Sequence, residues 1–75
     1  MPRYFFRLRD GGTLRDEEGE ELADTEAACA AALEIFAETV PSKREELVNG
    51  GDYEVMVTDA DAVQVYSISA KGHRY

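Results

Sequence analysis

The segment from Asp24 to Val40 most constrains the fold, because it is the longest stretch with the spacing of a helix. Its many alanines favour a helix. We expect Asp24 to be the N-cap, since its carboxylate can accept hydrogen bonds from the first turn, and Pro41 to end or bend the helix. The spacing of three and four residues predicts a buried stripe of Cys29, Ala32, Leu33, Phe36 and Val40. The opposite side is predicted to hold Ala27, Ala31, Glu34 and Glu38, with Ile35 at the margin.

Strands are predicted on both sides of this helix, because residues 3–9 and 53–58 alternate between apolar and polar side chains. The faces expected to meet the helix carry Tyr4, Phe6 and Leu8 in the first strand and Tyr53, Val55 and Val57 in the second. Residues 10–12, Asp-Gly-Gly, are typical of a hairpin turn that leads into a short return strand at 13–15.

The segments that follow the helix are shorter. Ser42 and Glu45 have the spacing of a capping box, so we expect a short helical turn that runs to Val48 and packs under the main helix. A turn at 59–62 leads into the last strand, 63–69, whose apolar residues fall on both faces: Val63 and Val65 on one, Tyr66 and Ile68 on the other.

The order strand, strand, helix, strand, strand predicts an α+β fold of two layers, with one main helix on a mostly antiparallel four-stranded sheet. The first and third strands are the most apolar, so we place them in the centre. Residues 1–69 are expected to form a single domain, and residues 70–75 a flexible tail.

Charge narrows the classes of partner. The chain of 75 residues has a net charge of −8, which argues against nucleic acid or an anionic membrane as the main partner.

A chain this small buries only about 60% of its unfolded surface, so a deep catalytic cleft is not expected. We find neither a signal peptide nor an apolar run as long as a membrane span, and expect a soluble cytoplasmic protein.

The face of the sheet that one helix cannot cover is the first candidate site. We expect it to carry Phe5, Met56 and Tyr66, the last with Ile68, mixed with Arg7 and Arg9. An apolar patch on a small protein often marks a contact with another chain. The leading hypothesis is therefore a non-enzymatic interaction domain that forms a homodimer through this face, and the alternative is an ordinary, partly exposed monomer surface.

An acidic segment before the helix is the second candidate site. We expect a solvated turn around Gly19, anchored by Leu22. Its carboxylates are Asp16, Glu17, Glu18, Glu20 and Glu21. Together with the net charge, they support a second hypothesis, a small acidic regulator that binds a basic protein as a nucleic-acid mimic or an antitoxin-like protein would.

The sequence predicts no catalytic residue, metal ligand or cofactor site. The segment from Asp16 lacks the glycine and the final glutamate of a calcium loop. Cys29 is the only cysteine and is predicted to pack in the core, and His73, the only histidine, has no second ligand nearby. Neither Gly-Gly pair belongs to a phosphate-binding motif. We therefore do not expect an enzyme.

The opening M-P-R-Y-F-F-R-L-R-D-G, the segment R-D-E-E-G-E-E-L-A-D and the alanine-rich helix resemble a family of short proteins from rhizobia and related alphaproteobacteria. The likeness is most specific over residues 1–28. That family has no known function, so the resemblance implies a bacterial cytoplasmic domain and supplies no catalytic residue. The chain departs from the family pattern at Ala23, where proline is common, and at Pro41.

Overall fold

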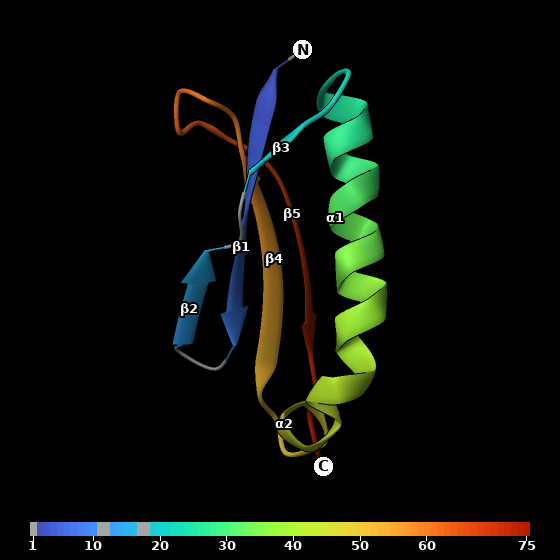
Figure 1. The fold of residues 1–75 in the computed structure, drawn as a ribbon. Coiled ribbons are helices and arrows are strands. Elements are labelled where there is room, and N and C mark those ends of the chain that lie inside the picture. Colours follow the sequence, from blue (N-terminus) through green and yellow to red (C-terminus); the bar gives the residue numbers. More distant parts are fainter. Residues whose placement is uncertain (1, 11–12, 17–18) are drawn as a thin grey trace.

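The computed structural model describes residues 2–10, 13–16 and 19–75, with only the backbone described at 13–16. It has two layers, a sheet and a long helix that lies along one face of it (Figure 1). The elements are β1 (Arg3–Asp10), β2 (Thr13–Asp16), β3 (Glu20–Glu21), α1 (Thr25–Thr39), a 3-10 helix (Val40–Lys43), α2 (Arg44–Val48), β4 (Asp52–Thr58) and β5 (Gln64–Lys71). The predicted α+β fold is confirmed.

The main sheet has the strand order β2-β1-β4-β5, and every neighbouring pair is antiparallel. The first strand and the long strand after the helix, β1 and β4, occupy the centre as predicted. They align Phe6 with Val57 and Leu8 with Val55. Since residues directly opposite each other point to the same face, these four side chains lie on one side of the sheet.

The core lies between this side of the sheet and α1. Its strand residues are the predicted ones: Tyr4, Phe6 and Leu8 of β1, and Tyr53, Val55 and Val57 of β4, all buried. From the helix, Ala28 and Ala32 are fully buried. Alanine has so small a side chain that α1 can lie close to the large residues of the sheet, which therefore supply most of the apolar volume of the core.

Tyrosine hydroxyl groups from the sheet hold α1 near both of its ends. The hydroxyl of Tyr4 lies 3.1 Å from Oγ1 of Thr25 at the start of the helix. The hydroxyl of Tyr53 lies 2.8 Å from Oγ1 of Thr39 at its end. Asp24 is the N-cap as predicted, and its carboxylate accepts a hydrogen bond of 2.9 Å from the N–H of Ala27.

The buried stripe of α1 differs from the predicted one. Leu33 was placed in the stripe but is 49% exposed, and Cys29 is only half-buried. Ala31 and Ile35, placed opposite the stripe and at its margin, pack against the core with Phe36. The helix is therefore rotated about its axis from the predicted orientation, so that Ala28, Ala32 and Ile35 face the sheet.

The capping box predicted after Pro41 does not form. Ser42 donates a hydrogen bond to the carbonyl oxygen of Thr39 instead, and α2 begins after Lys43 without a side-chain cap. Pro41 lies in the first turn of the 3-10 helix that follows, so α1 does not continue past this point. Val48, predicted to pack under α1, is exposed.

The far end of α2 meets the ends of β4 and β5 with very little space between the backbones. The N–H of Gly72 donates to the carbonyl oxygen of Gly51 at 3.1 Å. A Cβ at Gly72 would lie 1.5 Å from the carbonyl oxygen of Leu47, so no other residue fits there without a shift of the backbone. Ala70 and Lys71, predicted to belong to a flexible tail, belong to β5.

The last strand has an irregularity that explains its two apolar faces. Thr58 is opposite Gln64 whereas Val57 is opposite Tyr66, so Val65 is an extra residue in the ladder. Tyr66 and Ile68 face the helix together with Val57 and Val55, their partners on β4. Val65, Tyr66 and Ile68 all pack against the core.

Candidate functional site

The face of the sheet that α1 leaves uncovered is built mainly by the two central strands. Its cross-strand pairs are Phe5 with Thr58, Arg7 with Met56, and Arg9 with Glu54. Alternation in β1 explains the placement, because Tyr4, Phe6 and Leu8 point to the core and the residues between them point away. The structure thus brings together four of the five residues predicted for this face, Phe5, Arg7, Arg9 and Met56.

Tyr66, the fifth residue predicted for this face, lies on the opposite side of the sheet. It is directly opposite the buried Val57 and is half-buried against the core. Ile68 lies there too. The prediction was wrong because the apolar residues of the last strand occur on both parities, and the bulge at Val65 determines which parity meets the helix.

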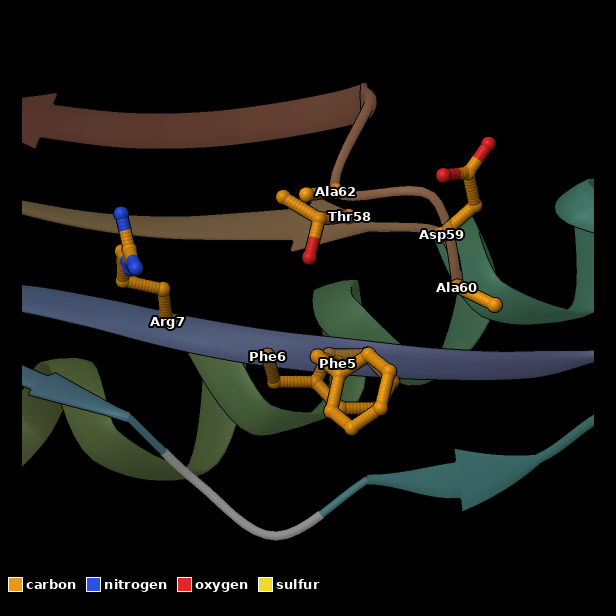
Figure 2. Close-up of a pocket in the computed structure, with 7 residues that line it drawn as sticks. All are labelled: Phe5, Phe6, Arg7, Thr58, Asp59, Ala60 and Ala62. Atoms are coloured by element: carbon orange, nitrogen blue, oxygen red, sulfur yellow. The ribbon is translucent and has the colours of Figure 1, made fainter.

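Phe5 lies at the edge of an apolar hollow on this face, which has a volume of about 250 Å³. The hollow is lined by Phe5, Phe6, Arg7, Thr58, Asp59, Ala60 and Ala62. Figure 2 shows the ring of Phe5 on β1, and Thr58 and Ala62 at the end of β4 and in the turn that follows. The ring of Phe5 is 39% exposed. The hollow is therefore open to solvent beside this ring.

The arginines of this face are held by neighbouring groups. Arg9 forms an ion pair with Glu54, its partner across the strands. Arg3 donates a hydrogen bond of 3.0 Å to the carbonyl oxygen of Gly19, and its guanidinium lies 5.9 Å from the centre of the Phe5 ring. These contacts fix the side chains around Phe5. The face is thus a mixed apolar and charged surface.

A second candidate site is a shallow groove beside α1, on the flank that faces β3. Its volume is about 430 Å³. Its apolar floor is formed by Leu22, Ala27, Ala30, Ala31 and Ile35, and its carboxylates are Glu20, Glu34 and Glu38. The alanine side chains are short, so they project little from the helix at this place. The groove combines an apolar floor with a negative rim.

The acidic segment, predicted to be a solvated turn, forms strands at three of its residues. Glu20 and Glu21 are exposed but form β3, which pairs with Arg3 and Tyr4 at the start of β1. The N–H of Leu22 continues the contact with a 3.0 Å hydrogen bond to the carbonyl oxygen of Pro2. The backbone of Asp16 lies in β2, opposite Arg7, and Glu17 and Glu18 lie outside the described residues. The segment is therefore part of the sheet where it is described.

A protein family described as a domain of unknown function, DUF6894, matches residues 3–71. The chain belongs to this family. The resemblance to an uncharacterised family is thus confirmed at that level. No significant match to this chain was found among curated proteins or among solved structures.

The side chains that could bind a metal do not cluster in the described part of this DUF6894 chain. No group of three or more His, Cys, Asp or Glu side chains that could hold a metal ion occurs in residues 2–10 and 19–75. The half-buried Cys29 lies on α1, and the ring of His73 packs edge to face on Tyr75 with centroids 4.4 Å apart. In the same described ranges, no helix is long and apolar enough to cross a membrane.

Two features of the DUF6894 chain were missed from the sequence. The groove is missed because it depends on β3 lying beside α1, and adjacent glutamates are poor indicators of a strand. The hollow beside Phe5 is missed because it depends on the path of the turn after β4. In that turn Asp59 accepts hydrogen bonds from the N–H groups of Asp61 and Val63, and Ala62 has a φ of 63°. The run Asp-Ala-Asp-Ala predicts a turn but not its direction.

Proposed function

We propose that this DUF6894 domain is a non-enzymatic protein-interaction domain that self-associates through the uncovered face of its sheet. The observation that carries the proposal is the position of Phe5. It is a large aromatic side chain on a central strand, it is 39% exposed, and it borders an apolar hollow. Aromatic residues in such positions are typical anchors of protein interfaces.

A second copy is a reasonable partner because the charges of this face are matched locally. The ion pair between Arg9 and Glu54 places opposite charges side by side on neighbouring strands. A face that carries both signs can meet its own copy across a two-fold axis without setting like charges against each other. The half-buried Met56 lies opposite Arg7 on the next strand, diagonal to Phe5, and adds an adaptable apolar side chain to the same face.

The test is the mass in solution of the wild type and of Phe5→Glu, measured by size-exclusion chromatography with light scattering. A carboxylate in the centre of the interface would lose its water without gaining a partner. We expect the dissociation constant to rise by at least about tenfold, or about 1.4 kcal/mol. Val48→Glu is the matched control, since Val48 is also an exposed apolar residue but lies on α2. A wild type that stays monomeric at high micromolar concentration would refute the proposal. Equal masses for Phe5→Glu and Val48→Glu would refute it too.

The acidic groove supports a second candidate function, the regulation of a basic protein. Its rim carries Glu20, Glu34 and Glu38 around an apolar floor, and the chain as a whole has a net charge of −8. A partner that presents lysine or arginine beside apolar residues would be complementary to both features. This surface is separate from Phe5, so the two functions are independent.

A pull-down from the native cytoplasm at low salt tests the second candidate. The bait is the wild type, a variant with Glu20, Glu34 and Glu38 changed to Gln, or a control with Glu45 and Glu46 on α2 changed to Gln. We expect a basic protein to be retained by the wild type and the control, released by added salt, and lost with the groove variant. Equal retention by all three baits, or no basic protein on the wild type, would rule this candidate out.

A further inference from the structure

The outer edge of β5 is an open edge of the described sheet. β5 pairs with β4 on one side, and none of the strands in the described ranges 2–10, 13–16 and 19–75 pairs with its other side. An edge strand presents a row of N–H and C=O groups that a further strand can complete. The ladder with β4 is regular from Tyr66 to Lys71, beyond the bulge.

The hydrogen bond of Gly72 shows which residues of β5 point their backbones outward. Its N–H donates to Gly51, so the pair 51 and 72 is a hydrogen-bonded pair of the antiparallel ladder. Such pairs alternate. Tyr66, Ile68 and Ala70 therefore direct their backbone groups toward β4. The outward groups belong to the residues between them, Ser67 and Ser69, and to Lys71.

The side chains of this strand do not protect its edge. Natural edge strands are commonly blocked by proline, by charges or by a bulge. From Tyr66 to Lys71 the sequence is Tyr-Ser-Ile-Ser-Ala-Lys, with no proline, no carboxylate and one positive charge at its end. The bulge at Val65 protects only the beginning of β5.

The helix layer is also apolar on the side nearest this edge. The acidic groove lies along the flank of α1 that faces β3. With 3.6 residues per turn, the opposite flank carries Cys29 and Leu33, and Val40 follows at the C-cap. α1 packs on β4 and β5, so this flank is the one on the side of β5. Leu33, in the middle of the helix, is 49% exposed.

From these observations we propose that β5 pairs antiparallel with β5 of a second copy, across a two-fold axis near Ile68. In that register the outward groups of Ser67 meet those of the partner's Ser69, and Lys71 meets the partner's Val65, so no like charges face each other. The two sheets become one continuous sheet with both α1 helices on the same face. Ile68 and Leu33 then lie beside their own copies near the axis, which buries them further.

A second copy fits this edge better than an unrelated strand for a structural reason. The symmetric arrangement joins the helix layers as well as the sheets, so the backbone ladder and the apolar flank are completed together. This edge is distinct from the uncovered face, and the two contacts are compatible. Two perpendicular two-fold axes, one through the edge and one through the face, would give a tetramer.

The experiment uses Ser67→Pro, which removes the outward backbone N–H at position 67. Proline is tolerated at the outer side of an edge strand but cannot donate to an added one. We expect Ser67→Pro to remove the edge contact and raise its dissociation constant by at least about tenfold, measured by analytical ultracentrifugation. Ser67→Ala keeps the N–H and is expected to behave as the wild type. Circular dichroism spectra must match between the variants, which shows that the sheet is intact.

A second variant, Leu33→Asp, tests the helix contact without touching the strand. Its side chain is already half exposed, so we expect the monomer to stay folded and the edge contact to weaken. Equal masses for Ser67→Pro, Leu33→Asp and Ser67→Ala would overturn the proposal. If only Phe5→Glu loses association, the contact through the uncovered face is supported and the β5 edge contact is refuted. If only Ser67→Pro and Leu33→Asp lose association, the β5 edge contact is established and the contact through the uncovered face is refuted.

Discussion

Phe5 and Phe6 are chemically identical neighbours on β1 that lie on opposite faces of the sheet. Phe6 is 2% exposed and packs between the strands and α1, whereas Phe5 is 39% exposed beside the open hollow. The difference comes only from the alternation of side chains along a strand. One face of the sheet therefore packs in the core of the domain, and the other is partly exposed to solvent.

The largest expected effect comes from removing each of these two rings in turn. Phe6→Ala leaves a cavity in the core and is expected to lower the free energy of unfolding by about 3–5 kcal/mol. Phe5→Ala removes a ring already in contact with water and is expected to cost less than about 1 kcal/mol in the monomer. Urea unfolding followed by circular dichroism measures both. Similar losses for the two variants would contradict the division between the faces.

A smaller effect is expected from a polar contact on the covered side. Tyr53→Phe removes the hydroxyl that lies 2.8 Å from Oγ1 of Thr39. Since the remaining ring still packs on Phe36, with centroids 5.7 Å apart, we expect a loss of about 1 kcal/mol. The double variant with Thr39→Val is the control, because the coupling energy between the two positions isolates this contact. Additive losses would show that the hydroxyl groups do not interact.

The smallest effect is expected from the ion pair on the uncovered face. Glu54→Gln removes the charge that Arg9 faces, and the side chain of Arg9 is 52% exposed. Exposed pairs of this kind contribute about 0–1 kcal/mol. We expect the difference in unfolding free energy from the wild type to shrink further in 1 M salt, where charges are screened. A loss as large as that of Tyr53→Phe, unchanged by salt, would mean that this face also stabilises the monomer.

The covered face was predictable because alternation leaves one solution for β1 and β4. Phe6, Leu8, Val55 and Val57 are apolar at every second position, so only one side of each strand can be buried. The orientation of α1 was not predictable in the same way. The helix carries alanine, cysteine or leucine around much of its circumference, so its periodicity allows more than one stripe, and the packing against β4 and β5 decides between them.

The residues of the candidate sites likewise divide into those that the sequence predicts and those that it does not. Phe5 and Met56 follow from the parity of their strands, so the sequence predicts their face. Tyr66 does not, because the extra residue Val65 changes the parity of β5 relative to β4. The acidic groove depends on residues far apart in the chain, Glu20 and Glu38 among them, and exists only once β3 lies beside the helix.

The central pairing of β1 with β4 has a consequence for how the chain folds. It joins Phe5 to Thr58 across most of the sequence, whereas the β1–β2 and β4–β5 hairpins are local. Closing a long loop costs entropy before the contact is made. The hairpins and α1 are therefore expected to form and dissolve rapidly. The rate-limiting step would be the meeting of the two halves of the sheet beneath the helix, as in other small domains dominated by distant contacts.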